Sequence, residues 1–103
     1  MIMVSVMYPN QEGVAFDFVY WTATHLSLVA ELVGPALKGV EAERGLSGPL
    51  AGSPAPYVAV AHLLFDSVAE FQSAFGPHAA ALMADIPKFT NVSPTIQIGE
   101  VLD

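Results

Sequence analysis

The stretch Tyr57-Val58-Ala59-Val60-Ala61-His62-Leu63-Leu64-Phe65-Asp66-Ser67-Val68-Ala69-Glu70 contains the two signals that decide the fold. Residues 57–65 are apolar on both alternating faces except at His62, which predicts a strand that is covered on both faces. Ser67 and Glu70 form the S-x-x-E pattern of a capping box, which marks the start of a helix. A buried strand is therefore expected to pass directly into a helix.

The helix that follows Ser67 has a periodic apolar stripe. Gly76-Pro77 interrupts its backbone hydrogen bonding, so we expect a break there. Beyond the helix, residues 94–102 predict a last strand. The stripe consists of Val68, Phe71, Phe75, His78 and Leu82.

The first part of the chain repeats the order of strand and helix. Residues 2–8 predict a buried strand, which Pro9 and Asn10 end. Asp17 is expected to cap a helix, with Phe16 and Trp21 at the positions of a hydrophobic staple. Gly34-Pro35 ends this helix.

The middle of the chain completes the pattern. Residues 36–45 predict a charged strand at an edge of the sheet, and residues 45–56 predict a loop that Leu46 and Leu50 pin to the body. The order strand, helix, strand, strand, helix, strand predicts an α+β fold of the ferredoxin-like βαββαβ type. We expect one domain over residues 1–103, with a four-stranded antiparallel sheet and both helices on one face.

The composition indicates a second copy of the chain as partner and excludes nucleic acid and anionic membranes. Of the 103 residues 53% are hydrophobic and 13% charged, with a net charge of −7, which is more apolar surface than a small monomer hides easily. We therefore expect a homodimer in which the open sheet faces cover each other. Three cations are too few for binding to nucleic acid or to an anionic membrane. Without cysteine, signal peptide or membrane span, the chain is expected to be cytoplasmic.

His25 is the main candidate for catalysis. It lies in the apolar stripe of the first helix, and an imidazole between helix and sheet can act as a general acid or base. The alternative is a core histidine that is hydrogen-bonded to a backbone carbonyl. Asp85 is either a second catalytic group or the cap of the turn into Pro87.

A pocket and its cofactors are less clearly marked. The histidines lack the spacing of metal ligands, so we expect neither a metal nor another cofactor, and haem bound by His25 or His78 is a lower-ranked alternative. Several side chains are expected either to line a ligand pocket or to pack as ordinary core residues. These are Tyr8, Trp21, His62 and Phe89.

Motifs with a family resemblance run along essentially the whole chain: Tyr8-Pro9, Phe16-Asp17, Tyr20-Trp21 and His25, then Ala84-Asp85-Ile86-Pro87-Lys88-Phe89-Thr90, Ser93-Pro94 and Gln97-Ile98-Gly99-Glu100-Val101. They resemble the EthD-domain family, which is named after a component linked to ethyl tert-butyl ether degradation. The resemblance implies a dimeric α+β-barrel domain. In that family a proline commonly follows the helix histidine by two residues, whereas this chain has Ser27, which removes an expected kink.

The leading hypothesis is that a small apolar or aromatic molecule binds in a helix–sheet cavity near His25. Its reaction would be a cofactor-free acid–base step, an isomerisation or decarboxylation in small-molecule catabolism. The alternative is an accessory protein that binds a metabolite for a partner oxygenase, without turnover.

Overall fold

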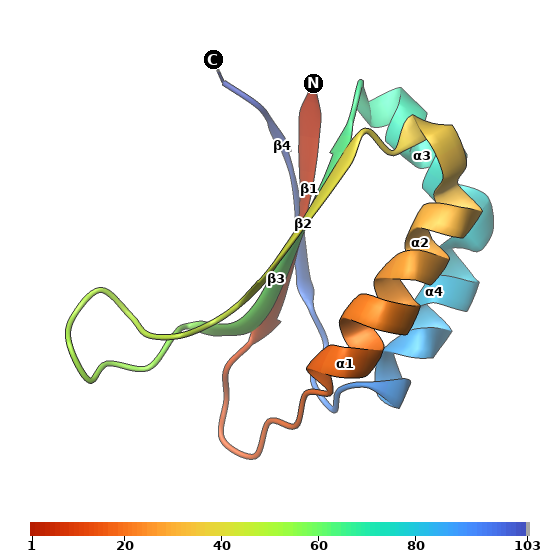
Figure 1. Ribbon diagram of the computed structural model, residues 1–103. Helices are drawn as coiled ribbons and strands as arrows, with labels where there is room; N and C mark the ends of the chain where they lie inside the picture. Colours follow the sequence, from red (N-terminus) through yellow and green to blue (C-terminus); the bar gives the residue numbers. More distant parts are fainter. Residues whose placement is uncertain (103) are drawn as a thin grey trace.

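The computed structural model describes residues 1–102, and two helical segments pack against one face of a single sheet (Figure 1). The sheet contains β1 (Ile2–Pro9), β2 (Gly39–Arg44), β3 (Tyr57–Phe65) and β4 (Thr95–Glu100). Their order is β2-β3-β1-β4, and all neighbours are antiparallel. The predicted α+β fold with βαββαβ order is confirmed. Asp103, the last residue of the predicted domain, lies outside the described residues.

The first helical segment begins as the sequence predicts. It consists of α1 (Phe18–Tyr20), a π-helical turn (Trp21–His25) and α2 (Leu26–Val33). Asp17 caps it by accepting a hydrogen bond from the Tyr20 backbone N–H at 3.0 Å, and the rings of Phe16 and Trp21 form the staple with centroids 5.1 Å apart.

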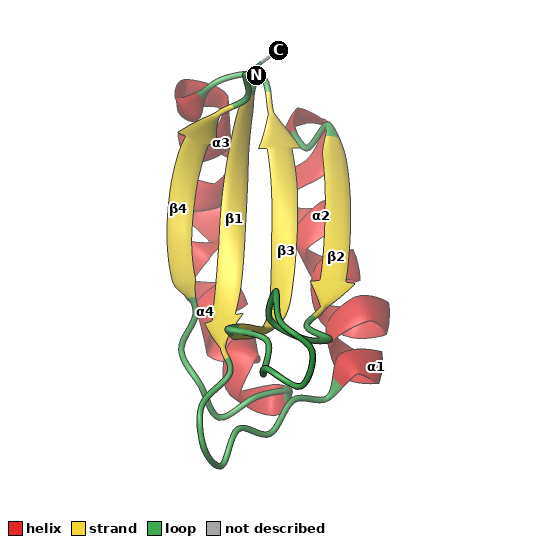
Figure 2. Ribbon diagram, turned by 90° about the vertical axis from the view of Figure 1, so that its left-hand side faces the viewer, coloured by secondary structure: helices red, strands yellow, loops and turns green. Residues whose placement is uncertain are grey.

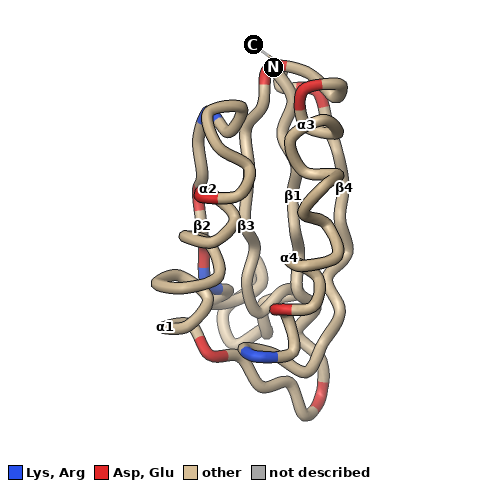
Figure 3. The backbone as a smooth tube through the Cα atoms, turned by 90° about the vertical axis from the view of Figure 1, so that its right-hand side faces the viewer, with Lys and Arg blue, Asp and Glu red and all other residues tan. Residues whose placement is uncertain are grey.

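The second helical segment contains the predicted break. Helices α3 (Val68–Phe75) and α4 (Ala79–Asp85) flank a 3₁₀ turn over Gly76–His78. The Ser67 side chain caps α3 through the Glu70 backbone N–H, at 3.1 Å. Charged residues are sparse along the helical layer (Figure 3).

Strand β3 presents alternate side chains to the two faces of the sheet. Ala59, Ala61, Leu63 and Phe65 are buried under the helices, whereas the residues between them face the side that no helix of residues 1–102 covers (Figure 2). The core under the helices therefore forms on one side of the sheet only.

Some predicted boundaries were wrong. The strand expected over 36–45 is shorter, because Pro35 lies in a 3₁₀ turn closed by a hydrogen bond from Leu37 N–H to Gly34 C=O. The last strand spans 95–100 instead of 94–102.

The loop between β2 and β3 also differs from the prediction. Leu46 and Leu50 are 89% and 74% exposed and do not pin it to the body. The loop extends away from the helices, on the side of the uncovered sheet face (Figure 1).

No helix in the described residues has the length and apolar character needed to cross a membrane.

Candidate functional site

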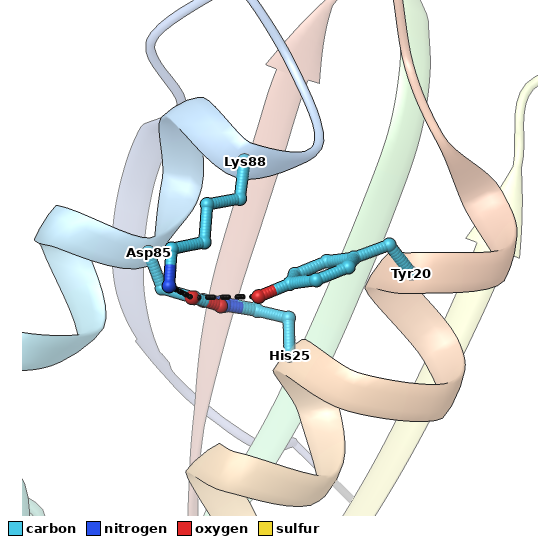
Figure 4. Close-up of polar contacts among 4 residues, drawn as sticks. All are labelled: Tyr20, His25, Asp85 and Lys88. Carbon is cyan, nitrogen blue, oxygen red and sulfur yellow. Dashed lines mark hydrogen bonds and ion pairs between the residues drawn. The ribbon is translucent and has the colours of Figure 1, made fainter.

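The two predicted catalytic residues, His25 and Asp85, are in direct contact. Nδ1 of His25 lies 2.9 Å from Oδ2 of Asp85, and each residue is only 6% exposed. The two side chains come from different helical segments and converge between them (Figure 4). The partner of His25 is therefore this carboxylate, and the alternative of a backbone carbonyl partner was wrong.

Two further residues bind the other oxygen of Asp85. The Tyr20 hydroxyl donates a hydrogen bond to Oδ1 at 2.9 Å, and Nζ of Lys88 lies 3.5 Å from the same atom. Asp85 does not cap the turn into Pro87, since its side chain accepts no capping hydrogen bond there. Both carboxylate oxygens are instead used to hold the cluster together.

These contacts determine how Asp85 and Tyr20 ionise. Burial works against ionisation of Asp85, but the hydrogen bonds from His25 and Tyr20 and the charge of Lys88 outweigh it, so the pKa of Asp85 lies below its ordinary value. The hydrogen bond to Asp85, with burial and the carboxylate charge, raises the pKa of Tyr20. Asp85 is thus a carboxylate at neutral pH and can only accept, so the ring N–H of a neutral His25 is at Nδ1, where it donates a hydrogen bond to Oδ2 of Asp85.

Trp21 and His25 are the first and last residues of the π-helical turn. The Leu26 N–H bonds to the Trp21 carbonyl, which widens the turn relative to an α-helix. Trp21 and His25 are four residues apart, a spacing that places both on one side of the helix, toward the cavity. The helix thus has a π-turn just before Ser27, the position at which the family's proline is absent.

Backbone contacts hold the end of the second helical segment against the start of the first. The Asp17 N–H donates to the Phe89 carbonyl at 2.8 Å, and the Thr90 hydroxyl donates to the Ala15 carbonyl at 2.7 Å. Asp85 lies one turn before Phe89. These bonds therefore place its carboxylate opposite the first helical turns, where Tyr20 and His25 are.

A cavity of about 50 Å³ lies between the helices and the sheet beside His25. Its lining is almost entirely apolar, and it holds only a small ligand, since pockets for drug-sized molecules are roughly 300–1,000 Å³. A volume of this size gives no support to the haem alternative. The lining residues are Val6, Tyr8, Trp21, His25, Leu26, Val29, Ala61, Leu63, Phe75, Leu82, Met83, Ile86, Pro94 and Ile96.

Three of the predicted site residues, Tyr8, Trp21 and His25, line this cavity. Phe89, the other aromatic residue predicted for the pocket, is not among the lining residues. It packs against His25, with the two ring centroids 4.6 Å apart. Asp85 is not among the lining residues, so it can act on a ligand only through His25.

His62 is not part of the pocket, which corrects the prediction. On β3 it lies between Ala61 and Leu63, which face the helices, so its own side chain faces the uncovered side of the sheet. There it contacts the Ser5 hydroxyl at 3.0 Å and the Glu43 carboxylate at 3.1 Å.

Sequence reasoning missed the roles of Tyr20 and Lys88. Tyr20 was named only as part of the motif Tyr20-Trp21, yet it stacks on Phe89, with centroids 6.1 Å apart, and donates a hydrogen bond to Asp85. The one available signal is the position of Tyr20 off the apolar stripe that contains His25, because an aromatic side chain there needs a second neighbour. That neighbour is the end of the second helical segment.

No group of three or more His, Cys, Asp or Glu side chains in residues 1–102 is arranged to hold a metal ion. His78 lies in the 3₁₀ turn and is not among the cavity-lining residues. The one basic nitrogen side chain among the cavity-lining residues of the described chain is therefore the imidazole of His25. Asp85 occupies its Nδ1 atom, which leaves Nε2 for a ligand.

Comparisons with known proteins agree in pointing to one family. Residues 12–93 match the family model described as the EthD domain. An EthD-like protein from Ralstonia eutropha JMP134 is similar in structure, with a TM-score of 0.94 and 36% identity over 99% of this chain and 92% of that one. A search of curated proteins found no match.

Two other solved structures share the fold at lower identity. An EthD family protein from Bacillus halodurans C-125 has a TM-score of 0.75 and 20% identity, over 99% of both chains. HapK from Hahella chejuensis has a TM-score of 0.62 and 19% identity, over 99% of this chain and 93% of its own.

Proposed function

Because the chain belongs to the EthD family, whose fold encloses the cavity beside His25, we propose that it binds a small, mostly apolar molecule there and catalyses a cofactor-free proton transfer on it. The observation that carries this proposal is the buried contact of His25 with Asp85 at the wall of an apolar cavity. A histidine held by a carboxylate at one nitrogen is a recurrent general base at the other.

The proposed step uses each group in a defined way. Nε2 of His25 takes a proton from a C–H bond of the ligand, and the electron pair of that bond moves into an adjacent unsaturated group. Asp85 stabilises the imidazolium that forms and fixes the ring tautomer. Return of the proton to another carbon completes an isomerisation.

Asp85 is suited to this role because its low pKa keeps it ionised. Tyr20 and Lys88 support that ionisation from the side away from His25. The apolar lining excludes most water from the imidazole, which strengthens its interaction with Asp85. In this account His25 is the catalytic residue and Asp85 positions it.

The test is a panel of small carbonyl, ether and aromatic compounds incubated with the protein in D₂O and followed by NMR. Exchange of ligand C–H protons in excess over protein, lost in His25→Gln, supports the proposal. Saturable binding without exchange on any compound contradicts it and favours the accessory protein that holds a metabolite for an oxygenase.

We also propose that two copies pair through the uncovered sheet face. Apolar side chains of β1 and β3 lie there in direct register, Met3 opposite Leu64 and Met7 opposite Val60. The β2–β3 loop, with exposed Leu46 and Leu50, extends on the same side. Light scattering is expected to return twice the chain mass of 10.9 kDa, and a mass of one chain would contradict the pairing.

A further inference from the structure

One buried polar atom of the described residues, Nε1 of Trp21, has no hydrogen-bond partner. Trp21 is 1% exposed, so its indole N–H has no access to bulk water. Leaving a buried donor without an acceptor is costly, and native proteins do so rarely. A buried donor of this kind marks either strain or a group that a ligand satisfies.

The side chain that carries this donor lines the same cavity as His25. Trp21 and His25 are the first and last residues of the π-helical turn, and their four-residue spacing places both at the cavity. A ligand in this small space therefore lies beside one proton acceptor, the imidazole, and beside two side chains that carry donors, the Tyr8 phenol and the Trp21 indole. Of these two donors only the indole N–H is a fully buried atom without a partner.

The remaining lining carries no cation. Of the residues that line the cavity in the described chain, none is Lys or Arg, and only Tyr8, Trp21 and His25 have polar atoms in their side chains. Burial raises the pKa of Tyr8, so its phenol stays neutral. A carboxylate or phosphate would lose its hydration here without gaining an opposite charge.

We propose that the ligand is a small uncharged carbonyl compound whose oxygen accepts a hydrogen bond from the Trp21 indole N–H. This inference rests on the proposed function, because it places the ligand in the same cavity. It goes further by naming the substrate class, a neutral ketone, aldehyde or ester with a C–H bond next to the carbonyl. Such a bond is acidified by the carbonyl, and the indole then stabilises the enolate oxygen that forms when His25 takes the proton.

Three probes of nearly the same shape test the class. Butanone has the acceptor oxygen, 2-methyl-1-butene replaces that oxygen by CH₂, and propanoate replaces a methyl group by a charged oxygen. The chain contains one tryptophan, so its single indole N–H signal in a ¹H–¹⁵N spectrum reports on Trp21 alone. We expect butanone to shift this proton downfield as it saturates, the alkene to bind without that shift, and propanoate not to bind.

Variants distinguish the contribution of the indole N–H to ligand binding from that of the aromatic ring. Trp21→Phe is expected to weaken butanone binding roughly 3- to 10-fold, the range of one hydrogen bond, and to leave alkene binding within about twofold. Ala61→Val narrows the cavity. The control is Ala42→Val, at the exposed residue of β2 that pairs with Ala61. It narrows a second, outer groove that Trp21 also lines, together with Phe18, Val19, Thr22, Ala42, Glu43 and Arg44. Only Ala61→Val is expected to abolish the butanone shift.

The outcomes distinguish this inference from the proposed function. Proton exchange that depends on His25 while the indole signal stays unmoved would overturn the carbonyl assignment alone. An indole shift with butanone but no exchange would support the assignment and contradict the catalytic step. Four results would overturn the assignment. Two concern the probes' relative behaviour: butanone and the alkene shift the indole signal equally, or propanoate binds more strongly than butanone. The other two are that none of the three probes binds, or that Ala42→Val abolishes the butanone shift. The wild-type indole shift serves as the readout even if Trp21→Phe does not fold.

Discussion

Nδ1 of His25 and Oδ2 of Asp85 lie 2.9 Å apart in the core, although 60 positions separate the residues in the chain. Each comes from a different helical segment, and both are almost fully buried. The contact links the two halves of the βαββαβ fold at the cavity wall. It therefore ties the stability of the helical layer to the chemistry of the site.

Removal of the carboxylate charge is expected to destabilise the fold. In Asp85→Asn the amide cannot accept from both Nδ1 of His25 and the Tyr20 hydroxyl as the carboxylate does. We predict a loss of about 1–3 kcal/mol in the free energy of unfolding, as for a buried group left unsatisfied. Urea denaturation at pH 7 measures it.

Lys88→Met is the matched control for that variant. The Lys88 side chain is 66% exposed, and exposed ion pairs contribute about 0–1 kcal/mol. Its effect should be smaller than that of Asp85→Asn. If the two variants lose equal stability, the buried contact with His25 is not the main interaction of Asp85.

Acid is expected to remove the stability that Asp85 provides. The pKa of Asp85 is lower in the folded chain than its ordinary value, so the contribution is present above the unfolded value of about 3.9 and is lost as the pH falls through the lower folded value. Unfolding of wild type and Asp85→Asn should differ most near neutral pH, and the difference should shrink below about pH 4. A difference that grows in acid would show that the pKa of Asp85 is raised instead.

Tyr20 should ionise later than a free phenol, because its hydroxyl donates to the Asp85 carboxylate. In NMR titrations to alkaline pH, its ring signals should change at a pH above 10, the ordinary pKa. In Asp85→Asn the titration should move down toward that value, while Lys88→Met should move it little. Unchanged titration of Tyr20 in Asp85→Asn would contradict the hydrogen bond.

Gly45 is expected to be needed where β2 leaves the sheet. A Cβ there would overlap the Tyr57 carbonyl oxygen and lie 2.8 Å from Cβ of Ala55. Gly45→Ala should therefore cost about 1–3 kcal/mol in thermal or urea unfolding. Gly99→Ala is the control, because a Cβ at Gly99 in β4 meets only Nε2 of Gln97, at an ordinary contact distance of 3.9 Å, and it should change the free energy of unfolding less than Gly45→Ala does. Equal effects of the two variants would refute the overlap.

Local signals in the sequence predicted most of the fold. The caps at Asp17 and Ser67 and the break at Gly76-Pro77 each depend on neighbouring residues only, and all three were confirmed. The β2–β3 loop was predicted less well. Its leucines are apolar, but nothing within the loop's own sequence reveals that it extends away from the body.

The site was predicted in its parts but not in its connections. His25 and Asp85 were both identified, yet helical spacing within one segment carries no information on a partner 60 positions away. Tyr20 was missed as a donor for the same reason. His62 was misplaced because an apolar strand leaves open which of its alternating faces meets the helices, and that is set by register with β1.

The central claim, that His25 transfers a proton to and from a bound ligand, is tested most directly by deuterium exchange next to the carbonyl of butanone in D₂O. Wild type is expected to catalyse the exchange, and His25→Gln to lose roughly 10²- to 10⁴-fold of the rate, the usual contribution of a general base. Asp85→Asn should also slow it, with butanone affinity nearly unchanged. Exchange at the same rate in wild type and His25→Gln would contradict the account.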